Sequence, residues 1–348
     1  MAPIDRKDSH LTLCLEDEVE LGSDGASGFA GLRFDHDALP EVDLAAVSTE
    51  STLLGKRLAA PLVVGAMTGG TARAGELNRR LALAAEACQV GMALGSQRRM
   101  IQDPSSRGSF AVREAAPGLP LLLGNLGAVQ LNYGVGVAEL RRAVEDVGCD
   151  GFLFHLNPLQ EAIQPEGETR FSALVPKLRE VAPALGVPVL LKEVGSGISR
   201  TTALKLRDLP IAGVETAGVG GTSWSRIESL RTTDPVQRST GELFARWGIP
   251  TAESISICRA ALPDRVVIAS GGIRNGIEVA KALALGADAV SLALPLLRAA
   301  ARSVEEAVLA LRRVVEELRT VMFLTGCRSV AELRRRPLTR ARDLTAEE

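Results

Sequence analysis

Eight short apolar runs follow one another along the chain, each followed by a glycine or polar cluster and then by a helical pattern. A run without polar alternation is typical of a strand buried on both faces, as in a parallel sheet. Eight such strands, each followed by a helix, are the number that closes a barrel. The runs are Pro61–Met67, Met92–Gly95, Pro120–Gly124, Gly151–His155, Val187–Lys192, Ile211–Val214, Arg265–Ala269 and Ala289–Ala293.

These runs predict an α/β protein, a (β/α)8 TIM barrel with an N-terminal extension and a C-terminal helical segment. An open doubly wound sheet is the competing topology, but the near-regular spacing of the runs favours the barrel. We expect residues 1–55 to form a cap, 56–335 the barrel and 336–348 a tail. The long connection Gly218–Asp264 is expected to cover a site. Amphipathic stretches predict helices at Leu77–Glu86, Val137–Val147, Ala173–Val181 and Gly276–Leu285.

Charge and cysteine usage exclude several classes of protein. With 40 basic against 42 acidic residues, nothing favours nucleic acid or an anionic membrane as a partner. The five cysteines are scattered singly, which argues against disulfides and zinc and indicates a reducing, cytoplasmic location.

The uncharged stretch Ala115–Ala138 holds five glycines and two prolines, so we reject it as a membrane helix. The acidic Glu16–Glu20 excludes a secretory signal.

Nearly every run ends in a polar residue or a glycine, and in a barrel the chemistry lies at these strand ends. Ser270–Gly276 opens a helix after the seventh run and predicts a phosphate cradle, because glycines let backbone N–H groups approach an oxyanion. The alternative is a tight turn that needs glycine for its backbone angles.

Lys192 ends a buried run in a chain with six lysines against 34 arginines. Its ammonium can stabilise negative charge on a flavin ring or a phosphate; the alternative is a pair with Glu193.

His155, Asn157, Gln160 and Glu161 follow the fourth run. One carboxylate among neutral ligands suits Mg²⁺ bridging to a substrate phosphate. The alternative for Glu161 is an acid that stabilises the first turn of a helix. We interpret His36 as structural. For Arg6, Lys7 and His10, composition alone favours a solvated tail.

Several segments together resemble one known family. Lys192 with Gly271–Arg274 looks like the FMN-binding barrels in general. The chain as a whole is similar to the type 2 isopentenyl-diphosphate isomerases from residue 6 to about residue 335. The matching segments are Arg6–His10, Met67–Gly70, Met92–Arg98, Gly124–Gln130, His155–Glu161, Gly220–Trp224, Trp247–Thr251 and Met322–Gly326.

The resemblance implies a redox-neutral isomerase of isoprenoid biosynthesis that needs reduced FMN and Mg²⁺, with NADPH as reductant and a small diphosphate as substrate. It also implies a homo-oligomer, a tetramer or an octamer. The FMN contacts would be Ala66, Met67, Thr68, Ser96, Asn125, Lys192, Thr222, Gly271, Gly272, Arg274, Ala293 and Leu294. The substrate contacts would be Arg6, Lys7, His10, Ser96, Gln97, Arg98, His155, Asn157 and Gln160. Glu161 would bind Mg²⁺, the catalytic set would be Gln160, His155 and Glu161, and Glu228 is a secondary candidate.

Two other functions stay open. The first is an FMN barrel oxidoreductase that passes hydride to an acceptor. Relatives that oxidise 2-hydroxy acids resemble one another in a catalytic His near the seventh strand, and this chain has no His after residue 155. Relatives that act on IMP use a Cys in the loop after the sixth strand, and Gly218–Gly248 has none. The second is a flavin-binding sensor without turnover.

Overall fold

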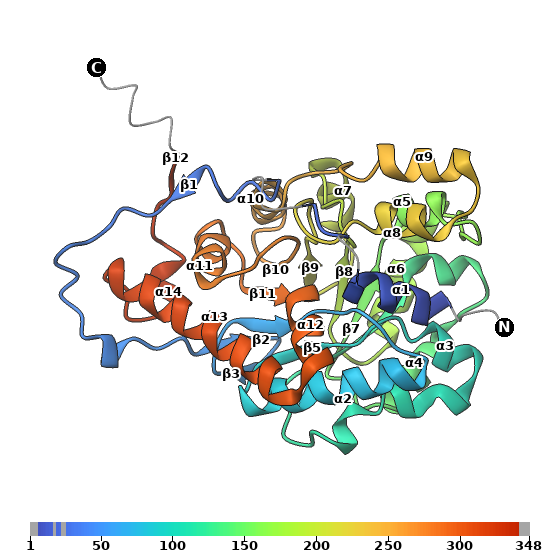
Figure 1. Ribbon diagram of the computed structural model, residues 1–348, viewed down its shortest axis with the longest axis horizontal. Helices are drawn as coiled ribbons and strands as arrows, with labels where there is room; N and C mark the ends of the chain where they lie inside the picture. Colours follow the sequence, from blue (N-terminus) through green and yellow to red (C-terminus); the bar gives the residue numbers. More distant parts are fainter. Residues whose placement is uncertain (1–5, 17–18, 22–25, 341–348) are drawn as a thin grey trace.

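A computed structural model describes residues 6–16, 19–21 and 26–340, without the side chain of Arg6. Eight parallel strands close into a barrel (Figure 1), so the predicted (β/α)8 fold is confirmed. Each strand overlaps one of the predicted runs, with ends shifted by up to three residues. Around the barrel they are β4 (Leu62–Val64), β5 (Gly91–Ala93), β6 (Leu122–Gly127), β7 (Gly151–His155), β8 (Val189–Lys192), β9 (Gly213–Glu215), β10 (Val266–Ala269) and β11 (Ala289–Leu292), which pairs with β4.

The register of neighbouring strands brings polar strand ends side by side. His155 at the end of β7 pairs in register with Lys192 at the end of β8. Lys192 in turn pairs with Glu215 at the end of β9. Three ionisable residues therefore lie next to one another at the carboxyl edge of the barrel, where barrel enzymes carry their chemistry.

The opposite end of the barrel is closed by apolar side chains. A hairpin of β2 (Ser51–Leu53) and β3 (Lys56–Leu58) places Leu53 and Leu58 there, each 1% exposed. Both pack with inward-facing strand residues that include Leu123 and Leu153. Part of the segment expected to form a cap thus lies at the end away from the strand carboxyl ends.

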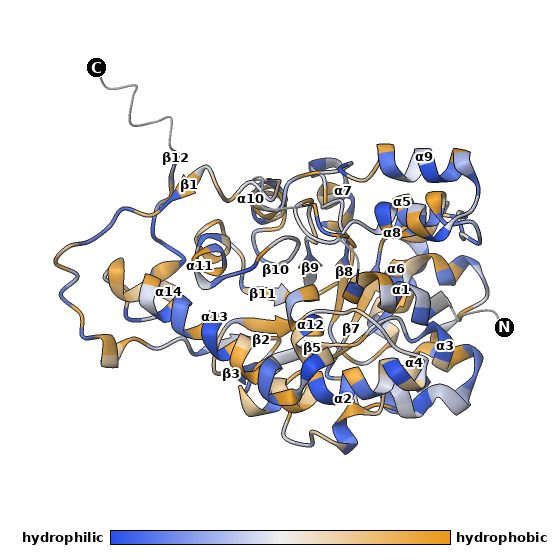
Figure 2. Cartoon of the chain, in the orientation of Figure 1, coloured by the Kyte–Doolittle hydropathy of each residue, from blue (hydrophilic) through white to orange (hydrophobic). Residues whose placement is uncertain are grey.

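Helices cover the outside of the barrel. Apolar and polar residues alternate along α2 and α13 (Figure 2), and apolar residues such as Leu77 and Leu81 of α2 and Leu311 and Leu318 of α13 are buried. The predicted helices are present with shifted ends, because helix boundaries follow caps that periodicity does not reveal. The helices that follow the first five barrel strands are α2 (Ala72–Ala87), α3 (Arg98–Gln102), α4 (Val137–Glu145), α5 (Pro158–Ile163), α6 (Leu174–Ala184) and α7 (Arg200–Leu206). The last two strands are followed by α11 (Gly276–Ala284), α12 (Leu294–Arg302), α13 (Val304–Leu324) and α14 (Val330–Leu333).

The long connection between β9 and β10 is helical rather than irregular. It contains α8 (Trp224–Arg231), α9 (Pro235–Leu243) and α10 (Thr251–Ala261). Helix α10 packs on β10 as an ordinary barrel helix, whereas α8 packs against α9 and α5.

Helix α1 (Arg6–Glu16) contacts α2, α8 and α12. The Thr71 hydroxyl at the start of α2 donates to Asp8 at 2.7 Å, and Arg298 Nε donates to the Cys14 carbonyl at 3.1 Å. These contacts hold α1 at the carboxyl edge. Near the other terminus, β1 (Leu32–Arg33) pairs with β12 (Thr339–Arg340). In the part of the chain that the structure describes, no helix has both the length and the apolarity to cross a bilayer. The proposed limits of extension, barrel and tail stay a prediction, and residues 341–348 lie outside the described residues.

Candidate active site

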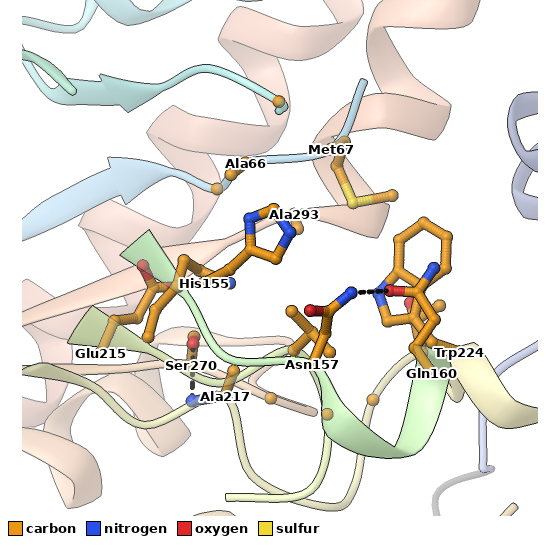
Figure 3. A pocket seen from close by; sticks show the side chains of 18 of the residues that line it. Ala66, Met67, His155, Asn157, Gln160, Glu215, Ala217, Trp224, Ser270 and Ala293 are labelled. Atoms are coloured by element: carbon orange, nitrogen blue, oxygen red, sulfur yellow. Dashed lines mark hydrogen bonds between the residues drawn. The ribbon is translucent and has the colours of Figure 1, made fainter. Parts of the chain in front are cut away.

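A single cavity at the carboxyl edge receives side chains from the ends of all eight barrel strands and from α1. It gathers most of the residues selected from the sequence, some of them shown in Figure 3. Selected residues on its lining are Lys7, His10, Ala66, Met67, Ser96, Arg98, Asn125, His155, Asn157, Gln160, Glu161, Lys192, Thr222, Gly271, Gly272, Arg274, Ala293 and Leu294.

Gln97, Thr68 and the secondary candidate Glu228 are not part of this lining. The side chain of Arg6 lies outside the described residues. Gln97 is fully buried, and its amide donates to the Ala143 carbonyl at 2.8 Å and accepts from the Asn125 N–H at 3.0 Å. Thr68 lies just behind the cavity wall, and its buried hydroxyl has no hydrogen-bond partner among the described residues. Gln97 therefore supports the backbone of Asn125, while Thr68 has an unused polar group.

His155 is held as a neutral imidazole. Asn125 Nδ2 donates to the Leu94 carbonyl at 3.0 Å, so Asn125 Oδ1 is the atom that lies 2.9 Å from His155 Nδ1. His155 Nδ1 therefore carries the proton and Nε2 is free to accept one. Burial, followed by the charges of Lys192 and Lys7, lowers the pKa of His155 to about 3. At neutral pH this residue is a hydrogen-bonding group and not a cation.

This pKa predicts how stability depends on pH. The unfolded imidazole takes up a proton below its ordinary pKa of 6.5, whereas the folded one stays neutral down to about 3. The unfolded state thus binds more protons in this window, and His155 makes the protein less stable as the pH falls through it. We expect His155→Gln to flatten the fall in melting temperature between pH 6.5 and 4.5. The exposed His36 supplies the control His36→Gln, and equal pH profiles for the two variants would contradict the assignment.

Lys192 is a buried residue whose side chain forms no ion pair with its neighbour Glu193. The Glu193 carboxylate accepts the backbone N–H groups of residues 194, 195 and 196 at 2.6–2.8 Å, while Lys192 Nζ donates to the Glu193 backbone carbonyl at 2.7 Å. Burial raises the pKa of Glu193 despite these hydrogen bonds. The predicted alternative, a side-chain pair between Lys192 and Glu193, is not formed. An ammonium 6% exposed is instead left at the cavity wall.

Two glycine turns meet backbone to backbone at the cavity wall. Gly271 and Gly272 have φ of +103° and +73°. A Cβ on Gly272 would lie 2.4 Å from the Gly220 carbonyl, and one on Gly221 would lie 2.7 Å from the Gly272 nitrogen. Gly271 and Gly272 both line the cavity, and among the described residues no hydrogen bond engages their N–H groups, which therefore suit an oxyanion cradle.

Arg274, next to this cradle, has a carboxylate partner from the N-terminal extension. Its guanidinium pairs with Glu20, which also contacts Arg298 Nη1 at 3.2 Å. Its own N–H donates to Glu278 Oε2 at 2.7 Å. Arg274 thus ties residues 19–21 to the turn after β10 while its side chain still lines the cavity.

The start of α5 forms a polar cluster on the other side of the cavity. Asn157 Nδ2 donates to Gln160 Oε1 at 3.1 Å and to Glu161 Oε1 at 2.9 Å, whereas its buried Oδ1 has no partner among the described residues. Gln160 Nε2 donates to Glu228 Oε1 at 3.1 Å. Figure 3 shows the bond between Asn157 and Gln160. An unsatisfied buried oxygen beside a carboxylate suits a cation or a bound water.

Glu228 is fully buried behind Gln160 and near α1. Its Oε1 lies 2.9 Å from His10 Nε2, and its Oε2 pairs with Arg231. Burial alone would raise the pKa of Glu228, but the interactions with the nearby His10 and Arg231 outweigh it and lower the pKa. The Gln160 amide is therefore oriented by an ionised carboxylate.

Sequence reasoning missed several residues of the lining. Glu215, 3% exposed, is the first polar residue after the sixth run and could have been found by the rule that identified Lys192. Ser291 lies inside an apolar run, Gln130 in a short 3₁₀ helix (Ala128–Asn132) and Gln164 at the end of α5, so no strand-end signal marks them. The Trp224 and His10 rings pack edge to face with their centroids 5.3 Å apart, and this contact depends on the placement of α1.

Comparisons with known proteins place the chain among flavin enzymes. A family model described as FMN-dependent dehydrogenase matches residues 167–340. An isopentenyl-diphosphate delta-isomerase from Synechococcus is 48% identical over 95% of this chain and 94% of the relative. An enzyme of the same name from Rickettsia bellii is 43% identical over 97% of this chain and 98% of the relative. Among solved structures, a mandelate oxidase variant superposes with a TM-score of 0.66 at 22% identity, covering 96% of this chain and 99% of that one, which shows the shared fold.

Proposed function

Because the chain belongs to the isopentenyl-diphosphate delta-isomerase family, we propose that it interconverts isopentenyl diphosphate and dimethylallyl diphosphate with reduced FMN and Mg²⁺. The observation that carries the proposal is the similarity to relatives of this name over nearly the full chain. Residues from six of the eight shared segments converge on one cavity, which supports the proposal.

The donor set on the glycine side fits FMN. The bare N–H groups at Gly271 and Gly272 suit its phosphate, and Lys192 suits a negatively charged ring. The unpartnered Thr68 hydroxyl offers a further hydrogen bond behind the wall. Bound reduced FMN would supply the acid and base that add one allylic proton and remove another, with no net electron transfer.

The donor set on the α5 side fits Mg²⁺. The Glu161 carboxylate accepts from Asn157 Nδ2 and from the Glu168 N–H. With the Asn157 Oδ1, which has no hydrogen-bond partner among the described residues, this carboxylate suits a cation that keeps waters and bridges to a diphosphate. The described residues hold no group of three or more His, Cys, Asp or Glu that could bind a metal ion by themselves.

The chain's own residues would anchor and orient the substrate. Lys7 and Arg98 approach the α5 cluster from α1 and α3 and suit the diphosphate. Met67 and Trp224 give the cavity apolar walls that suit a five-carbon alkene. Gln160, held between Asn157 and Glu228, would orient the reacting group. NADPH as reductant, a homo-oligomeric assembly and a cytoplasmic location belong to the same proposal.

Glu161→Gln tests the metal assignment. It keeps the shape of the side chain but removes the charge that would bind Mg²⁺, so we expect the stimulation by Mg²⁺ to disappear and kcat/KM to fall by about a hundredfold. Activity is measured as a function of Mg²⁺ concentration.

The matched control is Glu139→Gln. Glu139 is also an acid in the first turn of a helix and accepts the Gly136 N–H at 2.9 Å, but α4 carries it away from the cavity. A helix-stabilising role for Glu161 predicts the same small loss of stability in both variants and an unchanged response to Mg²⁺.

The alternative function is an FMN-dependent oxidoreductase, which the family model and the shared fold of the mandelate oxidases favour. Two assays under nitrogen separate the two functions. Purified protein with FMN, Mg²⁺ and NADPH is given isopentenyl diphosphate, and oxidised protein is given a panel of 2-hydroxy acids. We expect dimethylallyl diphosphate in the first assay and no flavin bleaching in the second. Bleaching by a hydroxy acid without isomerisation would overturn the proposal.

A further inference from the structure

The loop between α5 and α6 folds back tightly onto α5. The Gly167 N–H donates to the Gln164 carbonyl at 3.0 Å. A Cβ at Gly167 would lie 1.8 Å from the Glu161 carbonyl oxygen, so only glycine permits this approach. The turn delivers the next residue, Glu168, to the cavity wall.

Glu168 is an anchor for Arg98. Arg98 Nη1 and Nη2 donate to the two carboxylate oxygens at 2.8 and 2.6 Å, a bidentate pair, and Gln130 Nε2 donates to the same carboxylate. The Glu168 side chain is 13% exposed. Arg98 and Gln130 line the cavity whereas Glu168 does not, so the carboxylate lies behind the guanidinium.

The backbone of Glu168 contacts the acid predicted to bind Mg²⁺. Its N–H donates to Glu161 Oε2 at 2.6 Å, while Glu161 Oε1 accepts from Asn157 Nδ2 at 2.9 Å. One residue therefore fixes both a cation and an anion of the cavity, the first through its side chain and the second through its main chain.

We propose that Glu168 is a positioning residue for diphosphate binding, which rests on the proposed function. A guanidinium has five N–H donors, and the bidentate pair uses two, so three stay available to a ligand in a fixed plane. Without the Glu168 charge, Arg98 is released toward Glu161, the next carboxylate of the network. That pairing would take both groups away from the diphosphate and its metal.

The Glu168 charge also has an opposite effect on diphosphate binding. Whether the affinity for a diphosphate falls or rises when Glu168 is made neutral decides between the two effects. Glu168 also reduces the positive charge offered to an anion, so a mere counter-ion role predicts tighter binding once it is neutral. Positioning predicts weaker binding, because an ordered arginine is replaced by one that must be immobilised and separated from Glu161.

The test uses FMN-loaded Glu168→Gln and inorganic pyrophosphate as the probe, titrated by calorimetry with and without Mg²⁺. We expect its dissociation constant, and the KM for isopentenyl diphosphate, to rise by about tenfold. We expect kcat to stay within about threefold, because the diphosphate contacts are made in the ground state and transition state alike. Glu168→Asp, which keeps the carboxylate, should recover part of the affinity.

The control is Asp150→Asn at the far end of the barrel. Asp150 is 15% exposed, pairs with Arg113 and Lys56 and accepts the Leu122 N–H at 2.8 Å. Asp150→Asn should lose about as much thermal stability as Glu168→Gln, and its affinity for pyrophosphate should be unchanged. Unchanged or tighter pyrophosphate binding in Glu168→Gln, or an equal loss in Asp150→Asn, would overturn the proposal. A wild-type protein that binds pyrophosphate but does not isomerise the substrate would refute the proposed function alone.

Discussion

Gly272→Ala is expected to abolish useful FMN binding while the barrel still forms. The added Cβ would lie 2.4 Å from the carbon and oxygen of the Gly220 carbonyl, and this backbone cannot move without opening the cradle. Loss of one or two hydrogen bonds to a charged phosphate lowers affinity by about a hundredfold or more. The affinity is measured by titrating apoprotein with FMN and following the quenching of flavin fluorescence.

Gly186 supplies a closely matched control. It has the same φ of +73° as Gly272, but a Cβ there would meet nothing within 4 Å. Gly186→Ala therefore carries only the cost of a left-handed alanine, about 1–2 kcal/mol of stability. It should melt at a lower temperature and bind FMN normally. Equal FMN affinities in the two variants would mean that the turn after β10 does not hold the cofactor.

Lys192→Met is expected to lower kcat by about 10²–10³-fold, the usual effect of removing one preorganised donor from a site of developing charge. Methionine has a similar length and suits the burial of this position, so the change removes the ammonium with little loss of packing. Activity with pre-reduced FMN at saturating substrate measures the effect on turnover, and a parallel FMN titration measures the effect on binding.

Lys177→Met is the control for this change. Lys177 Nζ donates to the Leu131 carbonyl at 2.7 Å, the same kind of bond at the same distance as that of Lys192, but it lies outside the cavity. We expect a normal kcat in this variant. If Lys192→Met also kept its kcat within about threefold, the lysine would be a structural residue and not part of the reaction.

The sequence predicts the barrel well for a physical reason. A strand covered by helices outside and by other strands' side chains inside has no solvent face, so it reads as an apolar run, and each run from Pro61–Met67 to Ala289–Ala293 became a strand. The same logic identifies Lys192 and His155, since a polar residue that ends such a run must lie at the open edge. The hairpin of β2 and β3 was not predicted, because its short strands carry little periodic signal.

Long-range contacts are what the sequence could not supply. Nothing near Glu168 marks it as the partner of Arg98, because the pairing depends on how the loop after α5 folds back. Nor does the extension reveal that Glu20 reaches Arg274. Gln97 shows the opposite error: it stands between two cavity residues in the chain, but its side chain points into the wall between β6 and α4.

The central claim is that the flavin chemistry of this site is redox-neutral, and the most direct test is a stoichiometry. Under nitrogen in D₂O, the protein is given isopentenyl diphosphate, FMN, Mg²⁺ and a limiting, known amount of NADPH. If the reaction is redox-neutral, we expect many molecules of dimethylallyl diphosphate for each NADPH oxidised, with solvent deuterium in the product and no turnover when the reductant is omitted. One NADPH consumed for each molecule converted would contradict it and show a net transfer of hydride.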